Sequence, residues 1–462
     1  MKPNILFLVI DSFRSDKCFE INKKFKTPNL DNLIKNGVSF TNSITSSNST
    51  GPAWLSWFTG MYPFNTKKSE NYQKIADSTH NYIKDLKKNG YHTFATMPST
   101  AQHLGFTKEF DNEDAAYSIH SRLHTGLGDS ILEKIKSELF KEPWFYFIHI
   151  LDLHSPIYPP KEFDNEKYGK TSYERSISVI DSWIGKILEK INLEKTIIII
   201  TADHGNFIPN YTDTSNLEID RSNIDKKLWK LEDKIPKLLK PLMRKSGKII
   251  EKRRQLDRQL KIKNLNMSPF VKRNLLYSDL FTMFNPISEN NFLFDDIVKV
   301  PLILTGYRIN KDKKIDKQIR NSLDIFPTIF DLIEINLEEK IDGVSVVPII
   351  KGEDVKENIV YMEGYMSIKD DEIKKNIIGV RTSKYKYFRI REDLIKNIHL
   401  YDLEIDPLEE TNIVKTNPKI KEKMEEVLTQ IQKNSKETIE FDEMTEEETK
   451  KIEEELKKLG YI

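Results

Sequence analysis

The sequence predicts a layered α/β fold with a mainly parallel central sheet, followed by a small antiparallel C-terminal subdomain. The first observation is a set of continuous apolar runs of strand length, which is the pattern of strands buried on both faces of a parallel sheet. The second is the presence of capped helical segments between these runs. The third is a change after about residue 355, where the apolar segments become shorter and alternate with polar residues.

The elements follow in order along the chain. The predicted sheet strands occupy residues 4–11, 91–97, 143–150, 195–205 and 299–306. A helix is expected over 27–37, because Thr27 can cap it, Pro28 suits its first turn and Gly37 suits its end. A second capped helix is expected over 78–90. The C-terminal subdomain is expected to hold short strands within 358–368, 376–390 and 399–407, with charged helices over 417–435 and 444–459.

Length and composition limit the classes of protein. A chain of 462 residues is long for one core, and we expect a catalytic domain over 1–355 and the small subdomain over 356–462. The balance of 72 Lys and Arg against 71 Asp and Glu gives no global field to attract nucleic acid. The sole cysteine, Cys18, excludes an internal disulfide. The N-terminal apolar run is short and ends in charge, so it predicts a strand rather than a signal peptide, and a cytoplasmic protein.

One basic segment interrupts the pattern and predicts an insertion at about 207–290. Residues 221–273 contain 18 Lys and Arg against 5 Asp and Glu. Within them, 228–245 places leucines on one helical face beside lysines, which suits a helix lying on an anionic membrane surface. The alternative is a lid or a dimer contact whose apolar stripe packs on the core.

Acidic and imidazole side chains recur at the carboxyl ends of the predicted strands, where ligands bind in open α/β sheets. These residues are Asp11, then His149, Asp152 and His154, then Asp203 and His204. A single aspartate at such a position is often only a helix cap. Together, carboxylates and an imidazole predict a site for a divalent cation.

Several motifs resemble the sulfatase family of the alkaline phosphatase superfamily. The first four are PNILFLVIDSFRSD, TPNLDNLIKNGVSFTN, HILDLHSPIYPP and TADHG. Further along the chain come VKVPLILTG, SLDIFPTIFDLI, DGVSVVPIIKG and LYDLEIDPLEETNIV. Their order implies an alkaline-phosphatase-like layered fold and a metal-dependent enzyme acting on an anionic ester.

The chain also departs from the family pattern. Counting back from Thr59-Gly60 places Thr50 where the family has a cysteine or serine nucleophile, and Pro52 fits the motif. Trp54 stands where the family has arginine, and Ser12 replaces the second aspartate of the first motif. Pro98 lies near the position of a family lysine.

The resemblance implies a particular chemistry. Sulfatases oxidise their cysteine or serine to formylglycine, an aldehyde that threonine cannot give, so no formylglycine is expected. The superfamily includes phosphodiesterases, phosphoethanolamine transferases and phosphoglycerol transferases with threonine nucleophiles. We therefore expect Thr50 to attack phosphorus in a phosphoester or phosphodiester. Hydrolase and transferase remain open, and surface glycans or glycolipids are the expected substrates. The alternatives are a true sulfatase and a non-catalytic protein that binds anionic glycans.

The expected site follows from the same resemblance. One divalent ion is held by Asp11, Thr50, Asp203 and His204, because His399 is the only later histidine and is poorly placed for a second ion. Three oxygens and one nitrogen suit Mn²⁺, Mg²⁺ or Zn²⁺ better than Ca²⁺. Expected roles for other residues are leaving-group protonation or anion contact for His154 and substrate binding for Lys299 and His103. Asp152, Arg14 and Asp16 are expected to be structural.

Overall fold

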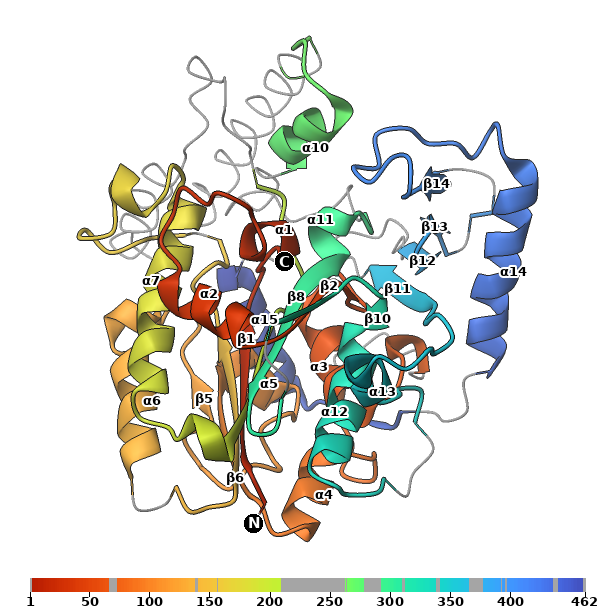
Figure 1. The fold of residues 1–462 in the computed structure, drawn as a ribbon. Helices are drawn as coiled ribbons and strands as arrows, with labels where there is room; N and C mark the ends of the chain where they lie inside the picture. The colour runs from red at the N-terminus through yellow and green to blue at the C-terminus, as the bar shows by residue number, and fades with distance from the viewer. Residues whose placement is uncertain are drawn as a thin grey trace.

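The computed structural model shows how the elements are arranged (Figure 1). The residues it describes are 2–65, 73–137, 140–155, 157–208, 262, 264–277, 292–309, 312–337, 341–364, 377–391, 393–394, 397–434 and 439–459. Within these ranges no helix combines the length and the apolar character needed to cross a bilayer. Most of the predicted insertion, including 228–245, lies outside them.

The described residues contain a nine-stranded sheet, and its main path runs β10-β2-β8-β7-β1-β6-β4-β5, with β9 beside β2. Its strands are β1 (Asn4–Ile10), β2 (Gly37–Ile44), β4 (His92–Pro98), β5 (Ala116–Tyr117), β6 (Trp144–Ile150), β7 (Thr196–Thr201), β8 (Lys299–Gly306), β9 (Lys313–Ile315) and β10 (Ile319–Arg320). Only β8, among these strands, runs antiparallel to its neighbours, β7 and β2. The mainly parallel sheet predicted from the sequence is confirmed.

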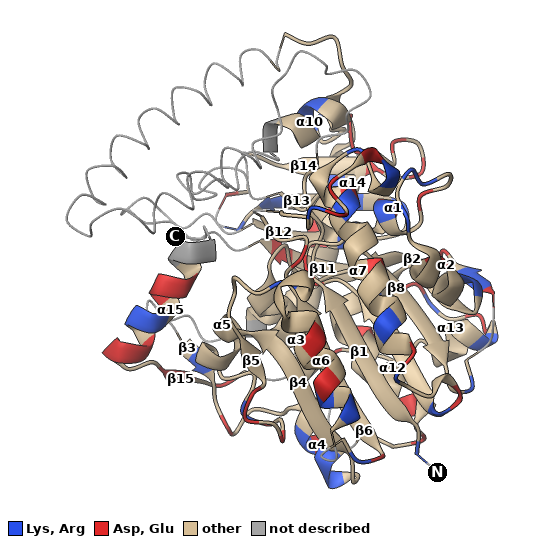
Figure 2. Ribbon diagram, turned by 90° about the vertical axis from the view of Figure 1, so that its left-hand side faces the viewer, with Lys and Arg blue, Asp and Glu red and all other residues tan. Residues whose placement is uncertain are grey.

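Helices cover both faces of this sheet, which explains why its central strands bury residues on both faces. Along β1, Ile5, Phe7 and Val9 join one buried cluster, whereas the alternate residues join another. The first cluster includes side chains of α3 (Thr50–Thr59), α4 (Tyr82–Lys88) and α12 (Asn321–Leu332). The second includes side chains of α2 (Pro28–Lys35), α6 (Leu127–Lys136) and α7 (Ser172–Leu188). Figure 2 shows no charged residue on β1, β4 or β6.

The N-terminal ends of α2 and α4 differ in detail from the prediction. Thr27 precedes α2 but makes no side-chain cap, and its hydroxyl instead donates to Asp31 Oδ2 at 3.1 Å. The helix expected over 78–90 begins at Tyr82, where the side chain of Asn81 accepts from the backbone N–H of Ile83 at 2.8 Å. Asparagine is among the preferred residues for this capping position.

The predicted antiparallel subdomain is a four-stranded sheet in the order β11-β12-β13-β14. Its strands are β11 (Val360–Gly364), β12 (Ile377–Arg381), β13 (Tyr385–Ile390) and β14 (His399–Asp402). Helix α14 (Pro418–Asn434) packs against β12 and β13. The last described segment returns to the larger domain instead. There β15 (Phe441–Glu443) pairs with β3 (Gln73–Ile75), and α15 (Glu446–Leu459) contacts α5 (Ser99–His103).

The first strand of this small sheet also holds the loop between β2 and α3. The backbone N–H of Glu363 donates to the carbonyl of Ser46 at 2.9 Å, and the N–H of Asn48 donates to the carbonyl of Glu363 at 3.3 Å. The buried carboxylate of Glu363 accepts from Tyr361 Oη at 2.7 Å and from Arg391 Nη2 at 2.9 Å. The subdomain therefore supports the segment that leads into α3.

Candidate active site

Three buried side chains meet at the carboxyl ends of neighbouring strands. Asp11 directly follows β1, His149 lies near the end of β6, and Asp203 follows β7. All three are fully buried. One ligand atom from each lies within 4.8 Å of the others, which is close enough to share a cation. The sheet order β7-β1-β6 brings these residues together.

Thr50 joins this cluster from the first residue of α3. Its Oγ1 lies 2.6 Å from Asp203 Oδ2 and 3.3 Å from Asp11 Oδ2. A hydroxyl has a single hydrogen, so the shorter contact takes it. The neighbouring hydroxyls of Ser47 and Ser49 pair with each other at 3.3 Å instead. Thr50 is thus the hydroxyl of this loop, among the described residues, that lies next to both carboxylates.

Ser12 occupies the other oxygens of the two aspartates. Its hydroxyl donates to Asp11 Oδ1 at 2.7 Å, and its backbone N–H donates to Asp203 Oδ1 at 3.2 Å. The backbone N–H of His204 also donates to Asp203 Oδ1, at 2.9 Å. Ser12 reaches both partners from a left-handed conformation with φ of 61°. As a result, the two Oδ2 atoms remain directed toward Thr50 and His149.

His204 has the geometry of a metal ligand. Its Nδ1 lies 2.8 Å from the carbonyl of Gly205, which can only accept, so Nδ1 carries a hydrogen. The neutral ring then has its lone pair on Nε2, which is buried, 3.5 Å from Asp203 Oδ2, and without a hydrogen-bond partner among the described residues. Burial opposes a charged ring, but the carboxylates of Asp203 and Asp11 raise the pKa of His204 above its ordinary value.

Gly205 lets the chain turn closely beneath this histidine. Its N–H donates to the carbonyl of Ile297 at 2.6 Å. A Cβ at this position would lie 2.1 Å from the carbonyl oxygen of Asp296, which no side chain tolerates. The glycine of the TADHG motif is therefore required by the approach of α11 (Asp295–Val298).

Asp11 is ionised in this environment. Burial alone would raise its pKa, but the adjacent ring of His149 and the nearby rings of His154 and His204 lower the pKa of Asp11 below its ordinary value. Two carboxylates, a hydroxyl and the lone pair of His204 make a mixed oxygen and nitrogen donor set that fits one divalent cation.

His149 was among the strand-end residues noted in the sequence, but it was given no role in the expected site. Its Nε2 lies 3.5 Å from Asp11 Oδ2 and 3.7 Å from Asp203 Oδ2. Its Nδ1 accepts from Trp54 Nε1 at 2.8 Å. The available signal was one histidine inside the otherwise apolar strand WFYFIHI. A buried imidazole in such a strand needs polar partners, which the sequence does not name.

The three remaining candidates lie in different settings. His154 is buried, its Nδ1 is 2.8 Å from the carbonyl of Ser155, and its charge interacts with that of Asp11. Burial lowers the pKa of His154, although Asp11 acts in the opposite sense.

Lys299 begins β8 opposite Ile44, at the same edge of the sheet. Burial lowers the pKa of Lys299, while Asp295 partly restores it. His103 is not brought to the aspartates, since its Nε2 lies 3.7 Å from Glu455 Oε2 on α15.

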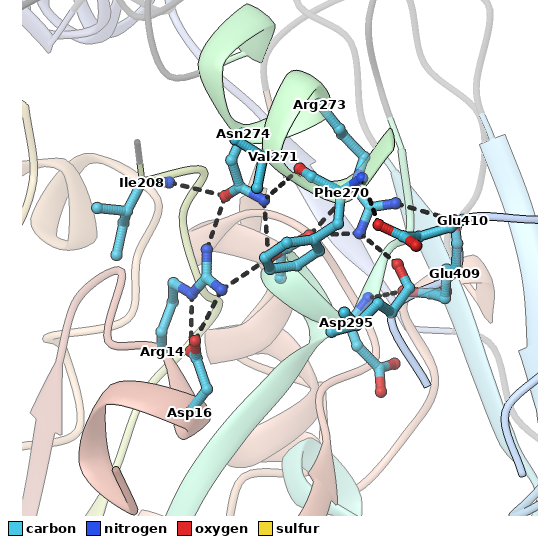
Figure 3. Close-up of polar contacts among 12 residues, drawn as sticks. Arg14, Asp16, Ile208, Phe270, Val271, Arg273, Asn274, Asp295, Glu409 and Glu410 are labelled. Atoms are coloured by element: carbon cyan, nitrogen blue, oxygen red, sulfur yellow. Dashed lines mark hydrogen bonds and ion pairs between the residues drawn. The ribbon is translucent and has the colours of Figure 1, made fainter. Parts of the chain in front are cut away.

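The loop after Gly205 is fixed by a buried polar network (Figure 3). Arg14 pairs with Asp16 at 2.7 Å and with Asp296 at 2.8 Å, as expected for a structural arginine. Its Nη1 also donates to Asn274 Oδ1 at 2.8 Å. The same oxygen accepts from the backbone N–H of Ile208 at 3.1 Å. The two described ends of the insertion, at Ile208 and on α10 (Pro269–Tyr277), are thereby joined.

Arg273 extends this network to the C-terminal subdomain. Its guanidinium is buried and lies 2.7 Å from Asp296 Oδ2. It also donates to the carbonyls of Glu409 and Leu408 at 3.0 and 3.1 Å. Arg273, the last residue of the basic segment 221–273, therefore faces the interior.

Comparisons with known proteins agree with the fold and the motifs. The sulfatase family model matches residues 3–335, and the model for the C-terminal part of N-sulphoglucosamine sulphohydrolase matches 287–437. Arylsulfatase K of Mus musculus is 20% identical over 460 residues, covering 93% of this chain and 79% of the relative. Choline-sulfatase of Rhizobium meliloti (strain 1021) is 24% identical over 466 residues, covering 90% and 83%.

Solved structures share the same fold. The phosphonate monoester hydrolase of Agrobacterium radiobacter superposes with a TM-score of 0.63 at 16% identity, covering 96% of this chain and 99% of that chain. The α/β architecture described above is therefore that of sulfatases and of a related hydrolase.

Proposed function

Because this chain belongs to the sulfatase family, whose members hydrolyse anionic esters, we propose that it attacks a phosphoester, in preference to a sulfate ester, through Thr50. The observation that carries the proposal is the hydroxyl of Thr50, which lies 2.6 Å from Asp203 Oδ2 at the position expected for the nucleophile. Hydrolysis and transfer to an alcohol share the first half of this reaction, and both are included.

The side chain of Thr50 favours phosphorus over sulfur. Formylglycine requires a primary alcohol or thiol, whereas the threonine hydroxyl is secondary and would oxidise to a ketone. An enzyme using Thr50 must therefore form an ordinary ester with the group it removes. A phosphothreonine can be opened by attack at phosphorus, whereas a threonine sulfate lacks the route that the aldehyde hydrate provides to sulfatases.

The described residues support a two-step reaction. In the first step Thr50 Oγ1 forms a bond to phosphorus, its proton passes to Asp203 Oδ2, and the alcohol of the ester leaves. The N-terminus of α3, which begins at Thr50, stabilises the negative charge that develops there. In the second step water or an acceptor alcohol attacks phosphorus, the bond to Oγ1 breaks, and Oγ1 takes back the proton that Asp203 holds. His154 is proposed to contact the anion or to exchange a proton with the leaving or entering oxygen.

A single divalent ion completes the proposal. Asp11, Asp203 and Thr50 would hold it through oxygen and His204 through Nε2, and Mn²⁺, Mg²⁺ or Zn²⁺ suit this set better than Ca²⁺. When bound, the ion would supply Lewis acidity and lower the pKa of the attacking hydroxyl. Lys299 is proposed to bind the anionic substrate. His103 is a weaker candidate, because Glu455 competes for it.

Glycans or glycolipids bearing phosphoesters are the proposed substrates, and the proposed setting is the cytoplasm, including the surface of an anionic membrane. The basic residues proposed to contact the membrane lie within 221–261, outside the described residues. Arg273 is excluded from this role by its buried ion pair with Asp296.

Sulfate ester hydrolysis is the second candidate, because the relatives that match along the chain are named sulfatases. A phosphonate monoester hydrolase shares this fold, so the fold is also compatible with attack at phosphorus. A purely binding protein is less well supported, because both buried aspartates, Thr50 and His204 are retained together.

A substrate panel tests the proposal. Metal-free protein would be supplied in turn with Mn²⁺, Mg²⁺, Zn²⁺ and Ca²⁺ and offered aryl phosphodiesters, phosphomonoesters, phosphonates and sulfates. We expect turnover of a phosphorus ester that depends on the ion and disappears in Thr50→Ala. Turnover of sulfates alone would support the second candidate, and no turnover of any ester would support a binding protein.

A further inference from the structure

Trp54 and His149 form a buried pair beside the two aspartates. Trp54 lies one turn after Thr50 on the same face of α3, because the two residues are four positions apart. Its indole Nε1 is 2.8 Å from His149 Nδ1, and both rings are almost completely buried. The rings meet edge to face, with centroids 5.3 Å apart and an interplanar angle of 80°. Phe106 packs against the indole with a centroid distance of 5.7 Å.

This contact determines where His149 carries its hydrogen. An indole N–H can only donate, so His149 Nδ1 must accept and holds no hydrogen. An imidazolium has hydrogens on both nitrogens, and the ring is therefore the neutral form protonated at Nε2. His204 has the opposite arrangement, because its Nδ1 faces the carbonyl of Gly205 and its Nε2 keeps the lone pair.

The Nε2–H of His149 points to the same oxygens that contact Thr50. Nε2 is 3.5 Å from Asp11 Oδ2 and 3.7 Å from Asp203 Oδ2, and among the described residues it makes no hydrogen bond at these distances. A nitrogen that carries a hydrogen has no lone pair for a metal, so the short distances among Asp11, His149 and Asp203 do not make His149 a ligand. We propose that Trp54 is a positioning residue that holds His149 with its Nε2–H directed at the two Oδ2 atoms.

The Trp54–His149 pair would replace one function of a cationic side chain at this position, which is to direct N–H groups toward the carboxylates. The resemblance places an arginine where Trp54 stands, and a guanidinium would donate hydrogen bonds with a positive charge. The Trp54–His149 pair directs an N–H toward the same carboxylates without a charge. The effect of this pair on turnover rests on the proposed function, whereas the tautomer and the ligand assignment do not.

The tautomer can be observed in the wild-type protein. Long-range ¹H–¹⁵N spectra of ¹⁵N-histidine-labelled protein distinguish protonated from unprotonated ring nitrogens, and the signals missing from His149→Gln identify His149. We expect Nδ1 to be unprotonated and Nε2 protonated. The opposite tautomer, or an imidazolium, would overturn the proposal. In Trp54→Phe, which keeps an aromatic ring without an N–H, we expect this preference to be lost.

Binding of Mn²⁺ alone to metal-free protein provides a readout independent of activity. The matched variants are His149→Gln, whose amide can still donate near the position of Nε2, and His204→Gln. We expect the dissociation constant of His149→Gln to stay within about threefold of wild type, and that of His204→Gln to rise by about tenfold or more. Equal losses in both variants would make His149 a ligand and overturn the assignment.

The positioning role is tested by turnover at full metal occupancy. We expect Trp54→Phe to lower kcat by about tenfold or more while metal content and thermal melting stay near wild type. An unchanged kcat would show that Trp54 has no positioning role in catalysis. If Thr50→Ala retains activity, the proposed function fails, while the spectra and the Mn²⁺ titrations still decide the tautomer and the ligand.

Discussion

The hydroxyl oxygen of Thr50 lies 2.6 Å from Oδ2 of Asp203, so the candidate nucleophile and a carboxylate able to take its proton are in contact before substrate binds. A candidate general base must lie within hydrogen-bond reach of the proton it removes, and this pair meets that requirement. Asp11 Oδ2 stands 3.3 Å from the same hydroxyl.

The first prediction concerns this hydroxyl. Thr50→Ala should abolish turnover, with a loss of at least about a thousandfold, because covalent catalysis has no substitute nucleophile in contact with both aspartates. Thr50→Ser should keep part of the activity. Mass spectrometry after an acid quench should find the phosphate on Thr50. Ser49→Ala is the matched control and should remain active; phosphate on Ser49 would contradict the assignment.

The second prediction concerns the metal. Asp203→Asn and His204→Ala should each lower the bound metal, measured by elemental analysis after dialysis, as well as the rate. Removing one donor weakens both the affinity for the ion and its Lewis acidity. His103→Ala serves as a control for bound metal, since His103 faces Glu455 on α15. Full metal occupancy in both site variants would point to another ligand set.

The third prediction concerns the pH dependence of stability. Burial raises the pKa of Asp152 to about 6, although Arg122 and the N–H of Leu123 act in the opposite sense. An acid whose pKa is raised on folding binds more protons in the native state, so stability falls as the pH rises from about 4 to about 6. The shift corresponds to a loss of about 3 kcal/mol.

The matched variant for this effect is Asp152→Asn, which cannot ionise and can still accept from Leu123. The free energies of unfolding of the variant and the wild type should be compared by denaturant titration at several pH values. We expect the variant to gain stability relative to wild type across the interval from about 4 to about 6. Parallel pH profiles would show that Asp152 has an ordinary pKa.

The fourth prediction concerns the basic segment. A variant in which a Gly/Ser linker replaces 221–261 should stay folded, because Ile208 and Asn274 are hydrogen-bonded and close the ends of the insertion. Wild type should co-sediment with phosphatidylglycerol vesicles at low salt and dissociate as the salt concentration rises. The linker variant should not bind, yet should keep its turnover of soluble substrates. Equal sedimentation with neutral vesicles would argue against a charge-driven contact.

The five sheet strands could be predicted because they consist largely of apolar residues, and the helices near residues 27–37 and 78–90 because start and stop signals flank them. The direction of β8 could not, since a continuous apolar run has the same pattern in parallel and antiparallel strands. The return of β15 to pair with β3 was missed for a related reason. Such short strands depend on a partner far away in the sequence, which periodicity does not report.

At the candidate site, the convergence of Asp11 and Asp203 followed from their places at strand ends. The Trp54–His149 contact could not be predicted, because it joins a helix to a strand across 95 positions of sequence. Trp54 was noticed only as a missing arginine. The burial of Arg273 could not be predicted either. A basic residue at the end of a basic segment is expected to be exposed, and the sequence does not show that its partner is Asp296.

The pairing of Glu363 with Ser46 and Asn48 has a consequence for how the protein is made. During synthesis the residues around Thr50 leave the ribosome long before those of β11. They therefore wait for a strand that lies more than 300 positions later before their backbone is fixed. A ribosome-bound chain halted before Val360 should carry every proposed metal ligand and still be inactive. Release of the complete chain, in which β11 pairs with β12 and Glu363 accepts from Arg391, should give activity, so the site is completed only after the C-terminal sheet has been synthesised.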